Sequence, residues 1–178
     1  DGVHINLLEF VGVFIDLFIS IKLLLRLDTP PSGFIMELIA DNTSALAWLK
    51  YAATTENQSV RALARLASCF IMYATNHLIS IQGTHISGPE NIEADCLSRL
   101  LPNGAVPSWD YVLKSCPRLI TCQACLLPSR LILTLAQLTT SPQIEVPFEQ
   151  LAQELLSLDV EILPTTSLTE GWTSTISA

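Results

Sequence analysis

Residues 83–99 read GTHISGPENIEADCLSR, and this stretch carries the clearest structural signals in the chain. The run before it, 78–82 (LISIQ), is apolar and typical of a strand, and 87–89 (SGP) marks a turn. Proline suits a first helical turn because its missing N–H would have no intrahelical partner there. The acids Glu90 and Glu93 are favoured near the positive end of a helix dipole, and Asp95 follows about one and a half turns into the helix. The stretch therefore predicts a strand that turns into an acid-bearing helix.

A second acid follows a second apolar run. Residues 34–40 (FIMELIA) lie between a turn and Asp41, and a short run of this kind predicts a strand buried on both faces. In open α/β sheets, sites form outside the carboxyl ends of the strands, which is where Asp41 lies. Either Asn42 or Thr43 can cap the helix that begins there. The order of elements predicts an α/β fold class.

Residues 4–27 form the most apolar stretch of the chain. Charged residues interrupt it, and a charge near the centre of a bilayer costs at least about 2.5–3.5 kcal/mol. At helical spacing, the polar and small residues fall on one narrow stripe: Asn6, Glu9, Gly12, Asp16 and Ser20. We therefore expect a helix that is buried on most of its surface and turns Glu9 towards a polar site. A membrane segment is the alternative.

Composition narrows the class of protein. The 178 residues carry a net charge of −8, from 17 acids and nine bases, and 49% of them are hydrophobic. The basic patch of a free-standing nucleic-acid binder is missing, whereas cations held by carboxylates would offset the acidity. The cysteine count of five is odd and no secretory signal is present, so we expect an intracellular protein of the cytoplasm or nucleus that is not secreted.

Two smaller features leave alternatives open. Residues 59–75 predict a helix on which Arg61 and Arg65 lie one turn apart, either on a solvated face or in contact with phosphate. The spacing of Cys116, Cys122 and Cys125 raises a zinc site, but a second Cys pair is absent and no histidine is near in sequence, so ordinary thiols are favoured.

The character of the chain changes after a Pro- and Gly-containing linker that begins at residue 101. Helices are predicted at 108–115, 128–139 and 147–158. The last stretch, 163–178, is rich in Thr and Ser and is expected to be disordered. We therefore expect one domain at 1–101 and a mainly helical extension at 102–178.

Three runs of the sequence (INLLEF, ADNTSALAWL and HISGPENIEADCLSR) together resemble the ribonuclease H domain of retrotransposon reverse transcriptases. The likeness covers residues 4–101 and is greatest to the DIRS-like group, with a weaker likeness of the C-terminal part to fungal members. The resemblance implies a partial ribonuclease H-like fold, a remnant of a mixed sheet with flanking helices. It also implies Mg²⁺ as the cofactor, with Glu9, Asp41 and Asp95 as catalytic metal ligands. His85 resembles a mobile catalytic histidine of the family.

The same resemblance implies cleavage of the RNA strand of an RNA–DNA hybrid, with that hybrid and a reverse transcriptase portion as partners and no small-molecule substrate. The family's fold begins with a three-strand meander that carries its first catalytic Asp, and this sequence begins at the helix after that meander. We therefore expect an N-terminally truncated remnant that is inactive. The alternative function is a non-enzymatic helical interaction or membrane-associated protein, anchored by residues 4–27.

Overall fold

A computed structural model describes residues 4–27, 33–51, 56–92, 94, 109–117, 125–143 and 146–162 of the chain. The chain divides into two compact units. The first comprises Asp1–Ile86 and Leu127–Val160, and the second comprises Ser87–Leu126 and Glu161–Ala178.

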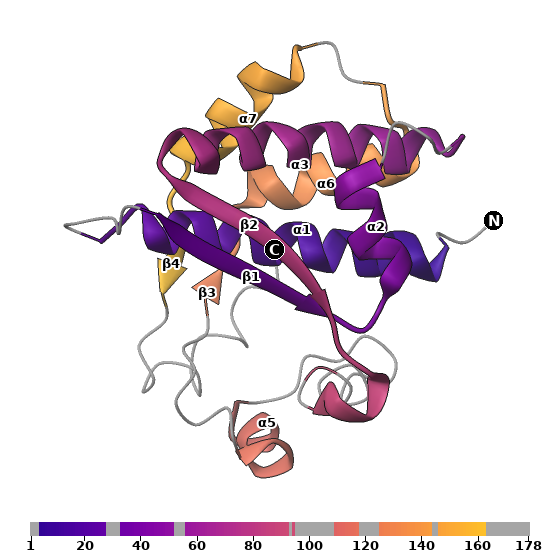
Figure 1. The fold of residues 1–178 in the computed structure, drawn as a ribbon, viewed down its shortest axis with the longest axis vertical. Helices are drawn as coiled ribbons and strands as arrows, with labels where there is room; N and C mark the ends of the chain where they lie inside the picture. Colours follow the sequence, from indigo (N-terminus) through magenta and orange to yellow (C-terminus); the bar gives the residue numbers. More distant parts are fainter. Residues whose placement is uncertain are drawn as a thin grey trace, which may run out of the picture. The chain divides into compact units, whose positions relative to one another are not determined.

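The first unit contains helices and a small parallel sheet, so the predicted α/β class is confirmed (Figure 1). In chain order its elements are α1 (Ile5–Leu24), β1 (Phe34–Ala40), α2 (Thr43–Tyr51), α3 (Gln58–Asn76), β2 (Ile79–His85), α6 (Ser129–Thr140) and α7 (Phe148–Ser157). Each of these elements was predicted from the sequence, with bounds that differ by a few residues. The largest differences are three residues at one end: β2 continues beyond the predicted 78–82, and α1 ends before the predicted residue 27.

Strands β1 and β2 pair in parallel, with Phe34 opposite Ile79 and Ala40 opposite His85. A parallel pair needs a long crossover connection, and here α2 and α3 supply it. Helix α3 passes directly into β2, and Leu78 makes this turn with a positive φ of 60°. Both strands therefore end at the same edge of the sheet.

Aromatic packing between α1 and α3 forms the centre of the core. The ring centroids of Phe14 and Phe70 are 5.1 Å apart, and those of Phe18 and Phe70 are 5.9 Å apart. On the α2 side, Phe10 meets Trp48 edge to face at 5.6 Å. Offset and edge-to-face pairs of this kind add to the stabilisation from burial.

Helix α1 corrects one prediction, because it is buried along a single face of the helix. The buried side chains recur at helical spacing: Leu7, Phe10, Phe14, Leu17, Phe18 and Ile21. On another face, the apolar residues Ile5 and Leu8 are 61% and 50% exposed. The sheet and the described helices of this unit cover one side of α1 only. The apolar residues on its other faces therefore remain exposed, although the sequence predicted a helix buried on most of its surface.

Strand β1 corrects a second prediction, burial on both faces. Its side chains alternate: Met36 and Leu38 are buried against the helices, whereas Ile35 and Ile39 on the opposite face are 63% and 53% exposed. In the described part of the chain, helices cover one face of this two-stranded sheet, so the alternation of a half-buried strand replaces the continuous burial expected for a parallel strand.

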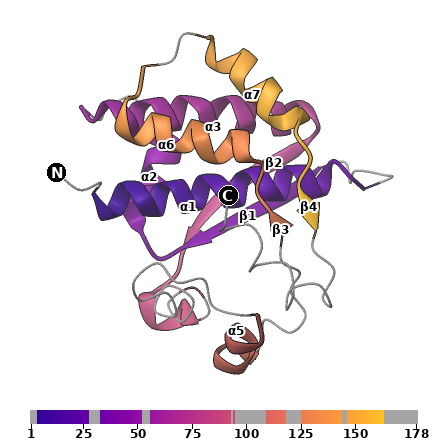
Figure 2. The same ribbon diagram turned by 180° about the vertical axis from the view of Figure 1, so that it is seen from behind.

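Two helices from the predicted C-terminal extension belong to this first unit. Both α6 and α7 pack on α3 (Figure 2). The end of α1 also binds the chain at the end of α7: Lys22 Nζ donates to the carbonyl of Leu156 (2.6 Å) and Arg26 donates to that of Val160 (2.8 Å). Cations favour the carbonyls at a helix C-terminus, so this pair fixes α7 against α1.

The second unit holds short elements: η2 (Gly88–Glu90), α5 (Trp109–Ser115) and the antiparallel pair of β3 (Cys125–Leu126) with β4 (Glu161–Ile162). The turn predicted at 87–89 is confirmed, and the carboxylate of Glu90 accepts hydrogen bonds from the backbone N–H and the hydroxyl of Ser87. The predicted domain boundary between residues 101 and 102 and the predicted disordered tail at 163–178 lie outside the described residues.

Replacing the central aromatic residue tests the core. We expect Phe70→Ala to lower the free energy of unfolding by about 3–5 kcal/mol, because it leaves a cavity between α1 and α3. Met72, two residues away on the same helix, is 61% exposed, so Met72→Ala should be close to neutral. Urea unfolding followed by circular dichroism measures both. Equal losses in the two variants would contradict the assigned core.

Asp16 on α1 allows a test by pH. Desolvation raises the pKa of its carboxyl group, although the residue is exposed to solvent, and the hydrogen bond from the Ser20 hydroxyl (3.3 Å) opposes this rise. A raised pKa in the folded state means that ionisation favours the unfolded chain, so stability from this group is lost as the pH rises.

Asp16→Asn should therefore raise the melting temperature at pH 7. The gain should disappear below about pH 3, where the carboxyl is protonated in both states. Thermal unfolding of both proteins across this range measures the effect, and a gain that grows with acidity would contradict it.

Candidate functional site

Polar side chains meet where β1 and β2 end. Asn42, two residues after β1, extends its amide towards α1, where it donates hydrogen bonds to the carboxylate of Glu9 and to the side-chain oxygen of Asn6 (3.3 Å). Glu9 and Asn6 are both half-buried and lie one turn apart on the predicted polar stripe of α1. Glu9 therefore contacts a polar side chain, that of the residue that precedes α2.

Asn42 also begins α2, because its side-chain oxygen accepts the backbone N–H of Ala45 at 2.9 Å. An Asn at the N-cap satisfies one of the N–H groups that a helix start leaves without a partner. The two ends of one amide therefore bind two elements: its oxygen holds α2 and its nitrogen holds α1. This fixes the orientation of the Glu9 carboxylate relative to the end of β1.

Asp41 and His85 lie side by side at the same edge of the sheet. The backbone N–H of Ile86 donates to the carbonyl of Ala40 (3.1 Å), which extends the strand pairing to this point. The Nε2 atom of His85 lies 3.2 Å from the carbonyl oxygen of Asp41 and donates to it in the tautomer protonated there. The carboxylate of Asp41 is exposed and has no hydrogen-bonding or ionic partner among the described residues.

Gly83 lets α2 approach this edge. A Cβ atom at Gly83 would lie 3.1 Å from the Cδ2 atom of Leu46, closer than ordinary van der Waals contact. Glycine therefore allows the first turns of α2 to lie against β2, which keeps Asn42 close to α1. In the stretch 83–99, this residue serves the packing of the site.

The described part of the site offers oxygen ligands of the kind that hard cations such as Mg²⁺ prefer. Glu9 is hydrogen-bonded to a neutral amide and has no Lys or Arg partner among the described residues, and the Asp41 carboxylate is uncommitted. Within those residues, no three His, Cys, Asp or Glu side chains converge closely enough to hold a metal. Asp95, the third predicted ligand, lies outside the described residues.

The other sequence-based alternatives have less to support them. In the part of the chain that the structure describes, no helix is both long and apolar enough to cross a membrane, α1 included. Of the proposed zinc ligands, Cys122 lies outside the described residues. Burial raises the pKa of the Cys125 thiol, which disfavours the thiolate that binds metal.

Comparison with family models, with curated proteins and with solved structures gives no match for this chain.

Sequence reasoning missed the role of Asn42 as the residue that joins α1 to the strand end. It identified Asn42 as a possible helix cap and Asn6 as part of the polar stripe, but it did not link them. The sequence contains the information needed for this link. When the side-chain oxygen of an N-cap Asn accepts a backbone N–H, its NH₂ group is left as a donor, and the polar stripe of α1 offers an acceptor for it.

The bridge can be tested by Asn42→Asp. The variant keeps the acceptor for the Ala45 N–H but replaces the donor to Glu9 with a second carboxylate. Like charges this close raise each other's pKa and favour protonation, so the variant should be destabilised at pH 7 and should recover as the pH falls towards 4. Chemical unfolding at several pH values measures this.

The matched control is Asn57→Asp at the N-cap of α3, whose side-chain oxygen also accepts a backbone N–H, that of Val60 (3.1 Å). A carboxylate is a good N-cap, so this control keeps its cap at pH 7, and no recovery of stability is expected as the pH falls towards 4. Recovery of both variants to the same extent would contradict a specific Glu9–Asn42 contact.

Proposed function

We propose that the chain contains part of a retroelement ribonuclease H domain, a domain whose activity is metal-dependent cleavage of the RNA strand in RNA–DNA hybrids. The observation that carries the proposal is the hydrogen bond between Glu9 and Asn42, since it joins the acid of the first helix to the Asp-Asn pair at the end of a strand. These residues belong to two of the three runs that resemble the family. The parallel pairing of β1 and β2 and the crossover through α2 and α3 are compatible with part of such a fold.

Glu9 and Asp41 would hold Mg²⁺, and the resemblance adds Asp95 as a third ligand. When bound, such an ion supplies Lewis-acid activation of a phosphodiester and of the attacking water. The protein would position the ligands: Asn42 orients Glu9, and the strand end presents Asp41 beside His85. The resemblance assigns three of the family's four acids to this sequence, so we expect weak cation binding and no hybrid cleavage by these 178 residues alone.

Cation binding is tested with Mn²⁺ as a paramagnetic probe. We expect Mn²⁺ to broaden amide signals around Glu9 and Asp41, with a dissociation constant on the order of 1 mM. Glu9→Gln should weaken this binding at least about tenfold, because it removes a charged ligand without changing the shape of the side chain. Asp16→Asn removes a carboxylate from the same helix about two turns away and should leave the broadening unchanged. Loss of binding in Asp16→Asn alone would contradict the site.

Activity is tested separately, with a labelled RNA–DNA hybrid and Mg²⁺. No cleavage is the expected result. Cleavage that Glu9→Gln abolishes would support the chemistry and refute the expectation of inactivity, whereas cleavage that survives Glu9→Gln would refute the assigned site. An in-frame reverse transcriptase upstream of residue 1 in the coding sequence would support the parentage.

A further inference from the structure

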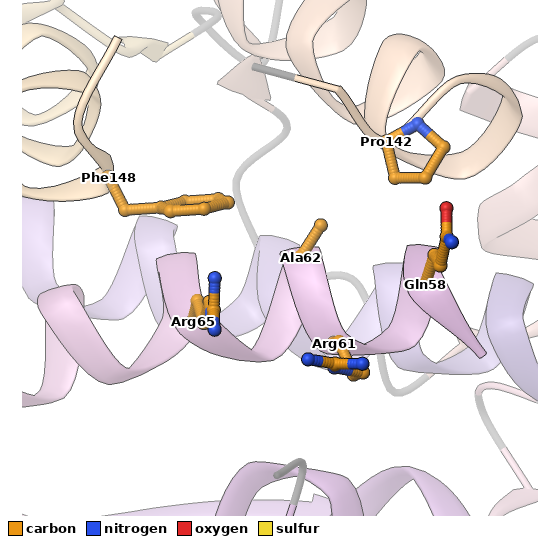
Figure 3. Close-up of a pocket in the computed structure, with 6 residues that line it drawn as sticks. All are labelled: Gln58, Arg61, Ala62, Arg65, Pro142 and Phe148. Atoms are coloured by element: carbon orange, nitrogen blue, oxygen red, sulfur yellow. The ribbon is translucent and has the colours of Figure 1, made fainter. Parts of the chain in front are cut away.

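A hollow of about 240 Å³ lies on α3, near the end of α6 and the start of α7 (Figure 3). Its lining combines two cations with apolar surface: Gln58, Arg61, Ala62, Arg65, Pro142 and Phe148. In Figure 3, the ring of Phe148 lies beside Arg65 at one end of the hollow, Pro142 and Gln58 lie at the other end, and Ala62 lies between the two ends. All six residues belong to the first compact unit.

Arg61 and Arg65 are neighbouring cations that have no acidic partner among the described residues. Both side chains are exposed, and neither forms an ion pair or a hydrogen bond with the described residues. In contrast, Arg26 binds the Val160 carbonyl, and Arg130 lies 4.0 Å from the carboxylate of Glu154. In a chain with 17 acids and nine bases, two neighbouring guanidinium groups without a partner in the described part of the chain are available to an external anion. Guanidinium groups bind phosphate through paired N–H donors.

Phe148 gives the hollow an apolar end. It is the first residue of α7, its ring is half-buried, and together with Ala62 and Pro142 it offers a surface for a ring or short hydrocarbon. Pro147, the N-cap of α7, makes no side-chain hydrogen bond to the helix start, and Glu149 in the first turn offsets the positive end of this helix, so the two arginines supply the attraction for an anion. Glu149 lines a separate hollow with Cys69 and Met72.

We propose that this hollow binds a small phosphomonoester that carries one ring. The phosphate group lies between Arg61 and Arg65, and the ring packs on Phe148. Sites for drug-sized molecules are commonly about 300–1,000 Å³. The hollow, at about 240 Å³, is smaller and suits a ligand of one ring and one phosphate group. This site is on α3 and shares no residue with the strand-end site, so it does not depend on the proposed nuclease ancestry.

Phenyl phosphate is the probe, compared with inorganic phosphate and phenol in NMR titrations of the full chain. We expect phenyl phosphate to bind severalfold more tightly than phosphate, and phenol to bind weakest. Arg61→Gln with Arg65→Gln should weaken phenyl phosphate binding at least about tenfold, because it removes the charged donors of the hydrogen bonds to the phosphate. Phe148→Leu should remove most of the advantage of phenyl phosphate over phosphate.

The matched control is Lys50→Gln with Arg130→Gln, which removes two exposed cations elsewhere and brings the net charge to the same −10, from −8 minus two. This control should bind phenyl phosphate within about twofold of wild type, because exposed charges at a distance are screened. Equal weakening in both double variants, or no binding by the wild type, would overturn the proposal. So would an oligonucleotide that binds at Arg61 and Arg65 far more tightly than phenyl phosphate, since it would assign the hollow to nucleic acid.

Discussion

The parallel pairing of β1 with β2 is the constraint on which the rest of the first unit depends. Parallel neighbours cannot be joined by a hairpin turn, so the chain between them must leave the sheet and return. It does so through α2 and α3, and α3 then packs Phe70 against α1. The same pairing brings both strand ends to one edge, where Asp41 meets His85. The parallel pairing of β1 with β2 therefore determines both the packing of the core and the position of the candidate site.

The positions of the helices and strands were predictable from the sequence, because they depend on residues that are close together in the chain. The apolar run at 34–40 matches β1 residue for residue, and the Pro at 147 marks the start of α7 correctly. Burial was harder to predict, since it depends on what covers an element. Ile35 and Ile39 have the composition of residues buried in a parallel sheet, yet they lie on the face that no described helix of this unit covers. Composition predicts the capacity for burial, and tertiary packing decides whether it occurs.

The sequence predicts which residues belong to the candidate site, but it does not predict which of their side chains are in contact. The polar stripe of α1 identified Glu9, and the strand end identified Asp41, but spacing does not show which side chains meet. Contact depends on how α1 packs against α2, where Phe10 meets Trp48, and on the close approach of α2 to β2 that Gly83 permits. Asn42 therefore emerged as the joining residue from the structure alone.

The central claim is that Glu9 and the end of β1 form a cation site. A crystal structure of the chain grown with Mn²⁺, with an anomalous difference map collected at the manganese edge, tests it most directly. A peak bonded to the Glu9 carboxylate and to Asp41, with Asn42 beside it, is the result expected. Manganese bound at other carboxylates, with Glu9 held by Asn42 alone, would contradict the claim.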